Sequence, residues 1–224
     1  MGLADLFLLR KTPYGSKESL AIIDEVFGFM RKIALDESEK LGEKLGVPSQ
    51  CQKLPNPRRN ITTLTVAPTG SIALIAGCNS GIEPIFSEFT TRKDNTGTYQ
   101  IFHPDYEEPY FRCAVASNGA EEVTWKEHIL VQNQVQKYID SGVSKTINFP
   151  NKTHRDTIAD SFMFAYDLGY VKGMTIYRNG SREIEVLSPK NLKKDKCPVC
   201  GEELIKESGC KHCSSCDFSV CEIG

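Results

Sequence analysis

Six of the nine cysteines in this 224-residue chain lie near its C-terminus, between positions 197 and 221. Cys197 with Cys200, and Cys213 with Cys216, form two separate pairs with the spacing Cys-x-x-Cys. Two such pairs can place four thiolates tetrahedrally around one ion, which is typical of a structural zinc site in a protein of the reducing cytosol. The spacing predicts a zinc-ribbon-like unit over 197–224 that binds Zn²⁺ through Cys197, Cys200, Cys213 and Cys216.

Two cysteines of this tail, Cys210 and Cys221, are left over by that assignment. Three alternatives remain open: they are spare thiols, Cys210 replaces Cys213 in the zinc set, or His212 replaces one thiolate. A unit this short buries little apolar surface, so bound metal would supply much of its folding free energy.

A second group of residues with chemical potential is the turn Ala67-Pro68-Thr69-Gly70-Ser71-Ile72. It follows a strand-like segment and precedes a helix-like one, and the first amides of a helix attract anions such as phosphate. Gly70 permits close approach to the backbone, while Thr69 and Ser71 add hydroxyl donors. The alternative is that the turn only caps the helix.

Alternating helices and strands surround these residues. Apolar spacing predicts a helix from Ser16 to before Gly46, a second from Thr124 to about Asp140, and a third from about Thr153 to Gly169. The third is expected to turn Ile158, Phe162, Ala165 and Tyr166 inward. Strands are expected at 62–66, 143–149 and 173–177, one hairpin within 90–122, and a lysine-rich linker at 183–196. The pattern indicates an α/β architecture with largely parallel strands.

Composition excludes some functions. The formal net charge of -2 argues against a dedicated binder of a nucleic acid polymer or an anionic membrane. No apolar run approaches the roughly 18 residues that span a bilayer. These features predict a cytoplasmic protein without membrane partners.

Several segments, in order along nearly the whole chain, carry a family resemblance. They are 65–76 with its turn, Ser80-Gly81-Ile82-Glu83-Pro84, 143–151, 172–182 and the cysteine tail. Together they resemble the adenosylcobalamin-dependent (class II) ribonucleotide reductases. The resemblance implies the C-terminal portion of a ten-stranded α/β barrel over 1–182, followed by the linker and the tail.

The same resemblance implies roles for individual residues. Thr69, Gly70, Ser71 and Ile72 would hold the phosphates of a ribonucleotide, favouring a diphosphate, and Glu83 would line the substrate pocket. Cys210 and Cys221 would relay electrons from a thioredoxin- or glutaredoxin-like reductant. The cofactors would be adenosylcobalamin and Zn²⁺, and the reaction the radical conversion of ribonucleotides to deoxyribonucleotides.

The family's radical cysteine lies in an N-x-C-x-E pattern, which does not occur around Cys51, Cys78 or Cys113. The resemblance therefore implies that the chain begins partway through the barrel, is inactive alone, and works with a partner chain that carries the N-terminal half and the radical cysteine. A catalytic piece of an oxygen-dependent reductase is an alternative, as is a non-catalytic nucleotide- or zinc-binding remnant.

Overall fold

The computed structural model describes residues 1–94, 97–103, 105, 108–116, 120–181, 187–189, 197, 202–207, 210–216 and 218–221. The helices within these ranges are α1 (Leu3–Leu9), α2 (Lys17–Leu45), the 3-10 turn η1 (Cys51–Lys53), α3 (Gly70–Ile75), α4 (Trp125–Gln136) and α5 (Arg155–Leu168). The strands are β1 (Phe89–Asp94), β2 (Gly97–Phe102), β3 (Arg112–Cys113), β4 (Glu121–Glu122), β5 (Thr146–Phe149), β6 (Thr175–Arg178), β7 (Leu187–Pro189), β8 (Leu204–Glu207), β9 (Cys210–Cys213) and β10 (Ser219–Cys221).

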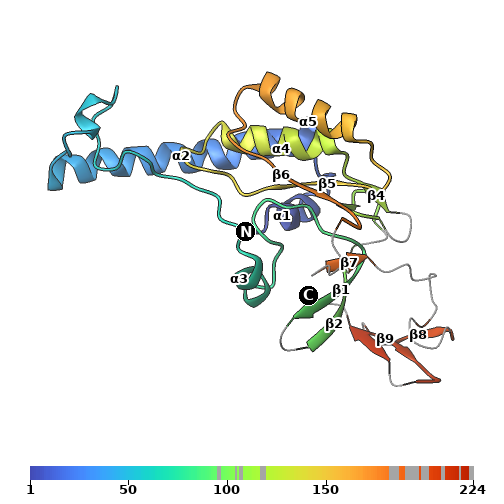
Figure 1. Ribbon diagram of the computed structural model, residues 1–224. Helices are drawn as coiled ribbons and strands as arrows, with labels where there is room; N and C mark the ends of the chain where they lie inside the picture. Colours follow the sequence, from blue (N-terminus) through green and yellow to red (C-terminus); the bar gives the residue numbers. More distant parts are fainter. Residues whose placement is uncertain are drawn as a thin grey trace.

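The centre of the fold is a strand–helix–strand unit. β5 and β6 pair in parallel and are connected through α5, as the alternation in the sequence predicts. Helices α4 and α5 lie on one side of this strand pair (Figure 1), and Ile129, Ile147, Phe149 and Ala165 form a buried cluster between them. Burial of these side chains holds the helices on the strands.

Helix α2 has the predicted ends. Ser16 caps its N-terminus by accepting a hydrogen bond from the amide of Ser19 at 3.2 Å, and Gly46, with φ of 84°, ends it. The helix packs on α4 through buried Ile23 and Phe27 and through Asp24, which accepts hydrogen bonds from Gln134 and Tyr138. These contacts fix the first half of α2 against the central unit.

Helix α4 begins with the predicted capping box: the Thr124 hydroxyl accepts from the Glu127 amide, and the Glu127 carboxylate accepts from the Thr124 amide. The helix ends at Gln136, earlier than the predicted Asp140. The side-chain amide of Gln136 donates to the carbonyls of Ile139 and Ser141, both at 2.9 Å, and these bonds support a tighter turn after the helix.

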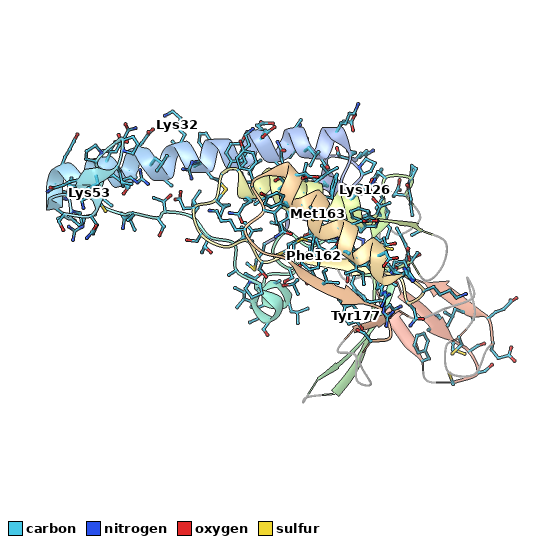
Figure 2. All side chains as sticks on the ribbon, turned by 45° about the horizontal axis from the view of Figure 1, so that its top comes forward. Lys32, Lys53, Lys126, Phe162, Met163 and Tyr177 are labelled. Atoms are coloured by element: carbon cyan, nitrogen blue, oxygen red, sulfur yellow. The ribbon has the colours of Figure 1, made fainter. Side chains whose placement is uncertain are left out.

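Two predictions about local structure are wrong. Residues 62–66 do not form a buried strand. Within this segment only Val66 makes a β-bridge, which is parallel and pairs it with Val143. The segment forms backbone hydrogen bonds with residues 141–144. In α5 the inward face is rotated from the expected one: Phe162 and Tyr166 are 51% and 79% exposed, while Ser161 and Ala165 are buried. Figure 2 shows Phe162 and Met163 on this helix.

Helix α5 carries two apolar stripes, and packing on β5 and β6 selects the one that also contains Ile158 and Leu168. Its cap also differs by one residue from the expectation. The side chain of His154, rather than that of Thr153, accepts the hydrogen bond from the Asp156 amide. The end at Gly169, in the left-handed conformation, is as predicted.

The remaining strands are antiparallel apart from the short β3–β4 pair. The hairpin predicted within 90–122 is β1–β2, and β7, which lies inside the predicted linker, pairs with β1. The tail forms the sheet β10–β9–β8. In the part of the chain that the structure describes, no helix has the length and apolar character needed to cross a bilayer.

Candidate functional site

The turn before α3 presents backbone amides to solvent. The first hydrogen bond of α3 runs from the Ala73 amide to the Thr69 carbonyl at 2.9 Å, so the amides of 70–72 precede the hydrogen-bonded part of the helix. Gly70, Ser71 and Ile72 are exposed, and α3 lies apart from the α4–α5 layer (Figure 1). The four residues predicted to hold phosphate are thus together and accessible.

This turn has an unusual backbone. Thr69 is a non-glycine residue in the left-handed region, with φ of 53° and ψ of 20°. Such a residue needs support from its surroundings because its Cβ crowds the backbone. The support comes from the segment 80–81: the Gly81 amide donates to the Thr69 hydroxyl at 2.9 Å, and the Ser80 hydroxyl donates to the Pro68 carbonyl.

Glu83 follows directly, and its side chain is 26% exposed. One carboxylate oxygen accepts a hydrogen bond from the Thr146 amide at 2.6 Å, and the other accepts one from the ammonium group of Lys145 at 2.5 Å. The structure therefore joins the segment after the turn 69–72 to the start of β5. It gives the Glu83 carboxylate two partners within the chain, and the role of Glu83 in a substrate pocket stays a prediction.

Lys145 and His128 complete this cluster, and both side chains are buried. The Lys145 ammonium lies 2.8 Å from Nδ1 of His128. Burial, opposed by Glu83, lowers the pKa of Lys145. Burial and then the charge of Lys145 hold the pKa of His128 well below its usual range, so His128 is neutral and its Nδ1 accepts the hydrogen bond.

Sequence reasoning missed this cluster. It left His128 as a surface or core residue and gave Lys145 no role. The signal was that Lys145 lies in the segment 143–149, which was predicted as a strand, and a lysine that such a strand buries needs a partner. The partner, Glu83, lies 62 positions away in sequence, and the sequence did not identify it.

Three of the four predicted zinc ligands meet in the tail. The sulfur atoms of Cys197, Cys213 and Cys216 all lie within 4.8 Å of one another, and those of Cys197 and Cys216 are 3.5 Å apart. In a tetrahedral site with Zn–S distances near 2.3 Å, sulfur atoms are about 3.8 Å apart. The donor set and its spacing fit zinc; Cys200, the fourth predicted ligand, lies outside the described residues.

The two predicted redox cysteines lie on neighbouring strands. The register of β9 and β10 places Cys210 directly opposite Cys221. Residues opposite each other in an antiparallel pair have Cα atoms about 4.5–5.5 Å apart, within the range that a disulfide spans. The backbone thus brings these two positions together, beside the strand end that carries Cys213.

The family model for the barrel domain of ribonucleotide reductases matches residues 53–110 and 101–177 of this chain. These ranges contain the phosphate turn, Glu83, His128 and Lys145. The chain is 35% identical over 220 residues to the vitamin B12-dependent ribonucleoside-diphosphate reductase of Thermoplasma acidophilum, covering 84% of this chain and 28% of that protein.

A relative of the same name from Mycobacterium tuberculosis is 30% identical over 249 residues, covering 97% of this chain and 35% of the relative. The chain thus spans about a third of the length of these curated relatives. Among solved structures, the class Id ribonucleotide reductase alpha subunit of Actinobacillus ureae matches with a TM-score of 0.64 at 18% identity, covering 80% of this chain and 38% of that one. This likeness shows a shared fold.

Proposed function

Because the chain belongs to the barrel-domain family of ribonucleotide reductases, we propose that it forms part of the catalytic subunit of a vitamin B12-dependent enzyme that reduces ribonucleoside diphosphates to deoxyribonucleotides. The observation that carries this proposal is the exposed turn at 69–72, braced from behind and lying within the matched family region. The radical cysteine and the remaining barrel strands belong to the part of the enzyme outside this chain, in the same polypeptide or in a second one.

In this proposal the turn binds the substrate's diphosphate. The amides of 70–72 lie at the N-terminus of α3, where the helix dipole favours negative charge, and the hydroxyl of Ser71 adds a donor. The Thr69 hydroxyl accepts from Gly81 and still has its own hydrogen to donate. Glu83 lines the substrate pocket in this proposal. Together these groups orient the ribose for the reaction without contributing electrons.

Adenosylcobalamin is proposed as the cofactor because the relatives named above are vitamin B12-dependent. When bound, such a cofactor supplies the radical that starts the reaction. The residues that the structure describes do not mark a place for a corrin ring.

The tail is proposed to have two separate tasks. A zinc ion held by Cys197, Cys213 and Cys216, with Cys200 as the fourth ligand, stabilises the small sheet β8–β10; the sulfur cluster supports this assignment. Cys210 and Cys221 act as a dithiol. They reduce a disulfide elsewhere in the enzyme to two thiols, become a disulfide themselves, and are reduced again by a thioredoxin- or glutaredoxin-like protein.

Reconstitution tests the proposed function. The purified chain, the remaining part of the catalytic subunit, and their mixture are each incubated with CDP, adenosylcobalamin and a dithiol reductant, and dCDP is measured. We expect dCDP from the mixture alone. Formation of dCDP by the chain by itself would refute the division of labour, and failure of the folded mixture to turn over would favour a non-catalytic remnant.

A further inference from the structure

Lys145 has a saturated and closed environment. Its side chain is 0% exposed. An ammonium group has three hydrogens, and three acceptors surround this one: the Glu83 carboxylate at 2.5 Å, Nδ1 of His128 at 2.8 Å and the carbonyl of Thr146 at 2.5 Å. With all three hydrogens used inside the protein and no exposed surface, Lys145 has no capacity to contact a ligand directly.

Glu83 is the only one of these three acceptors that is charged, so it compensates the buried ammonium. It also belongs to a loop rather than to a helix or strand. The Glu83 carbonyl accepts the Asn79 side-chain amide at 2.6 Å, and the Glu83 amide donates to the Ser80 carbonyl at 3.0 Å. These bonds make residues 79–83 a compact loop that Lys145 pins to the start of β5.

The same loop supplies the bonds that support Thr69 in its left-handed conformation, through Ser80 and Gly81. Contact at this point is close: a Cβ on Gly81 would lie 3.4 Å from the Ala67 carbonyl oxygen, and Gly81 itself has φ of 52°. A displacement of the loop 79–83 would therefore also displace the turn at 69–72. A continuous series of contacts runs from Lys145 through Glu83 and the loop to Thr69.

We infer that the ion pair between buried Lys145 and partly exposed Glu83 holds the turn at 69–72 in the conformation that binds phosphate, which makes Lys145 a positioning residue for the substrate. This inference rests on the proposed function, because it assigns a phosphate site to that turn. The pair fixes the loop 79–83, and the loop holds Thr69. His128 keeps the ammonium oriented by accepting one hydrogen.

The first experiment measures the turn without any ligand. Hydrogen–deuterium exchange of a peptide covering 67–75 is compared between the wild-type chain and Lys145→Met, which keeps a similar side-chain length and removes the charge. We expect the hydrogen-bonded amides of this peptide, from Ala73 onward, to exchange at least tenfold faster, because the first of them donates to the Thr69 carbonyl. The matched control is Lys137→Met, which breaks an exposed ion pair with Asp24 at 3.3 Å and should leave this peptide unchanged.

The second experiment measures binding of CDP and of cytidine by calorimetry to the complete catalytic assembly. For Lys145→Met we expect the Kd of CDP to rise at least tenfold while that of cytidine changes less than twofold, since only the phosphates touch the turn. A general loss of structure would weaken both. Ser80→Ala, an exposed change that removes one brace, should raise the Kd of CDP by about threefold.

Ser80→Ala guards against a variant that fails to fold. If Lys145→Met is unfolded by circular dichroism, Ser80→Ala carries the test, with the same expected asymmetry between CDP and cytidine. If folded variants show unchanged exchange at 67–75 and an unchanged Kd of CDP, the positioning role of Lys145 is refuted, while the proposed phosphate site is not affected. A wild-type assembly that binds CDP no better than cytidine would overturn the proposed phosphate site and this inference with it.

Discussion

Replacement of Gly70 by valine separates ligand binding from folding at the phosphate turn. A Cβ at this position would meet no atom within 4 Å, and Gly70 does not have a positive φ, so the backbone accepts a side chain. Valine also has a better helix propensity than glycine by about 0.3 kcal/mol. We therefore expect the folded state of Gly70→Val to be as stable as that of the wild type.

The effect on binding should be large, because the branched side chain occupies the space in front of the amides of 70–72. Loss of one hydrogen bond to a charged group costs about 1.5–3 kcal/mol. At about 1.4 kcal/mol for each factor of ten, loss of a single bond to phosphate weakens binding about 10- to 100-fold. The apparent KM for CDP in the reconstituted enzyme should rise at least tenfold, and the Kd measured by calorimetry should rise with it.

A matched control is available in Gly173→Val, whose added Cβ also meets no atom within 4 Å and which lies in the loop before β6, outside the turn. It should leave the KM for CDP unchanged. If Gly70→Val folds, melts at the wild-type temperature and keeps the wild-type KM, the turn is a helix cap and the phosphate site lies elsewhere.

Three further predictions concern the tail and the central unit. Cys213→Ser should lower bound zinc, measured by atomic emission, from about one ion per chain to near zero, whereas Cys78→Ser, away from the cluster, should keep it. Cys221→Ser should keep zinc and lose turnover driven by thioredoxin but not by dithiothreitol; full thioredoxin-driven turnover would remove Cys221 from the relay. Arg31 and Thr63 lower the pKa of Asp140 to about 2 from an ordinary value of 3.8. Because that pKa is depressed in the folded state, its contribution of about 1–2 kcal/mol is present above pH 4 and is lost as pH falls towards 2. The difference in urea unfolding free energy between wild type and Asp140→Asn should therefore shrink over that range, and a constant difference would contradict this assignment.

Local patterns in the sequence predicted those features that depend on a few neighbouring residues. Ser16, Thr124 and Gly169 mark helix ends because capping bonds form within one turn of the chain. The spacing Cys-x-x-Cys is local in the same way and places the thiols of Cys213 and Cys216 together, whereas the approach of Cys197 to them is a tertiary contact, and their binding of zinc stays a prediction. Three of the four predicted ligands meet in the structure, and the fourth is outside the described residues.

Features that depend on contacts between distant segments needed the tertiary structure. The strand predicted at 62–66 has suitable residues, but a strand exists only where neighbours pair with it, and only Val66 makes a bridge within the described chain. Helix α5 has apolar residues on more than one face, and its packing against α4 and the cluster on β5 and β6 decided which of them were buried.

The phosphate turn shows both kinds of information. The sequence by itself determined the residues Thr69 to Ile72 and, through their resemblance to a family, the chemistry they are proposed to perform. The tertiary structure alone decided what surrounds them: Gly81 bonds to Thr69 in its left-handed conformation, and Glu83 of the same loop pairs with Lys145, 76 positions beyond Thr69. Buried charges pair by proximity in space, and the order of residues along the chain does not specify that proximity.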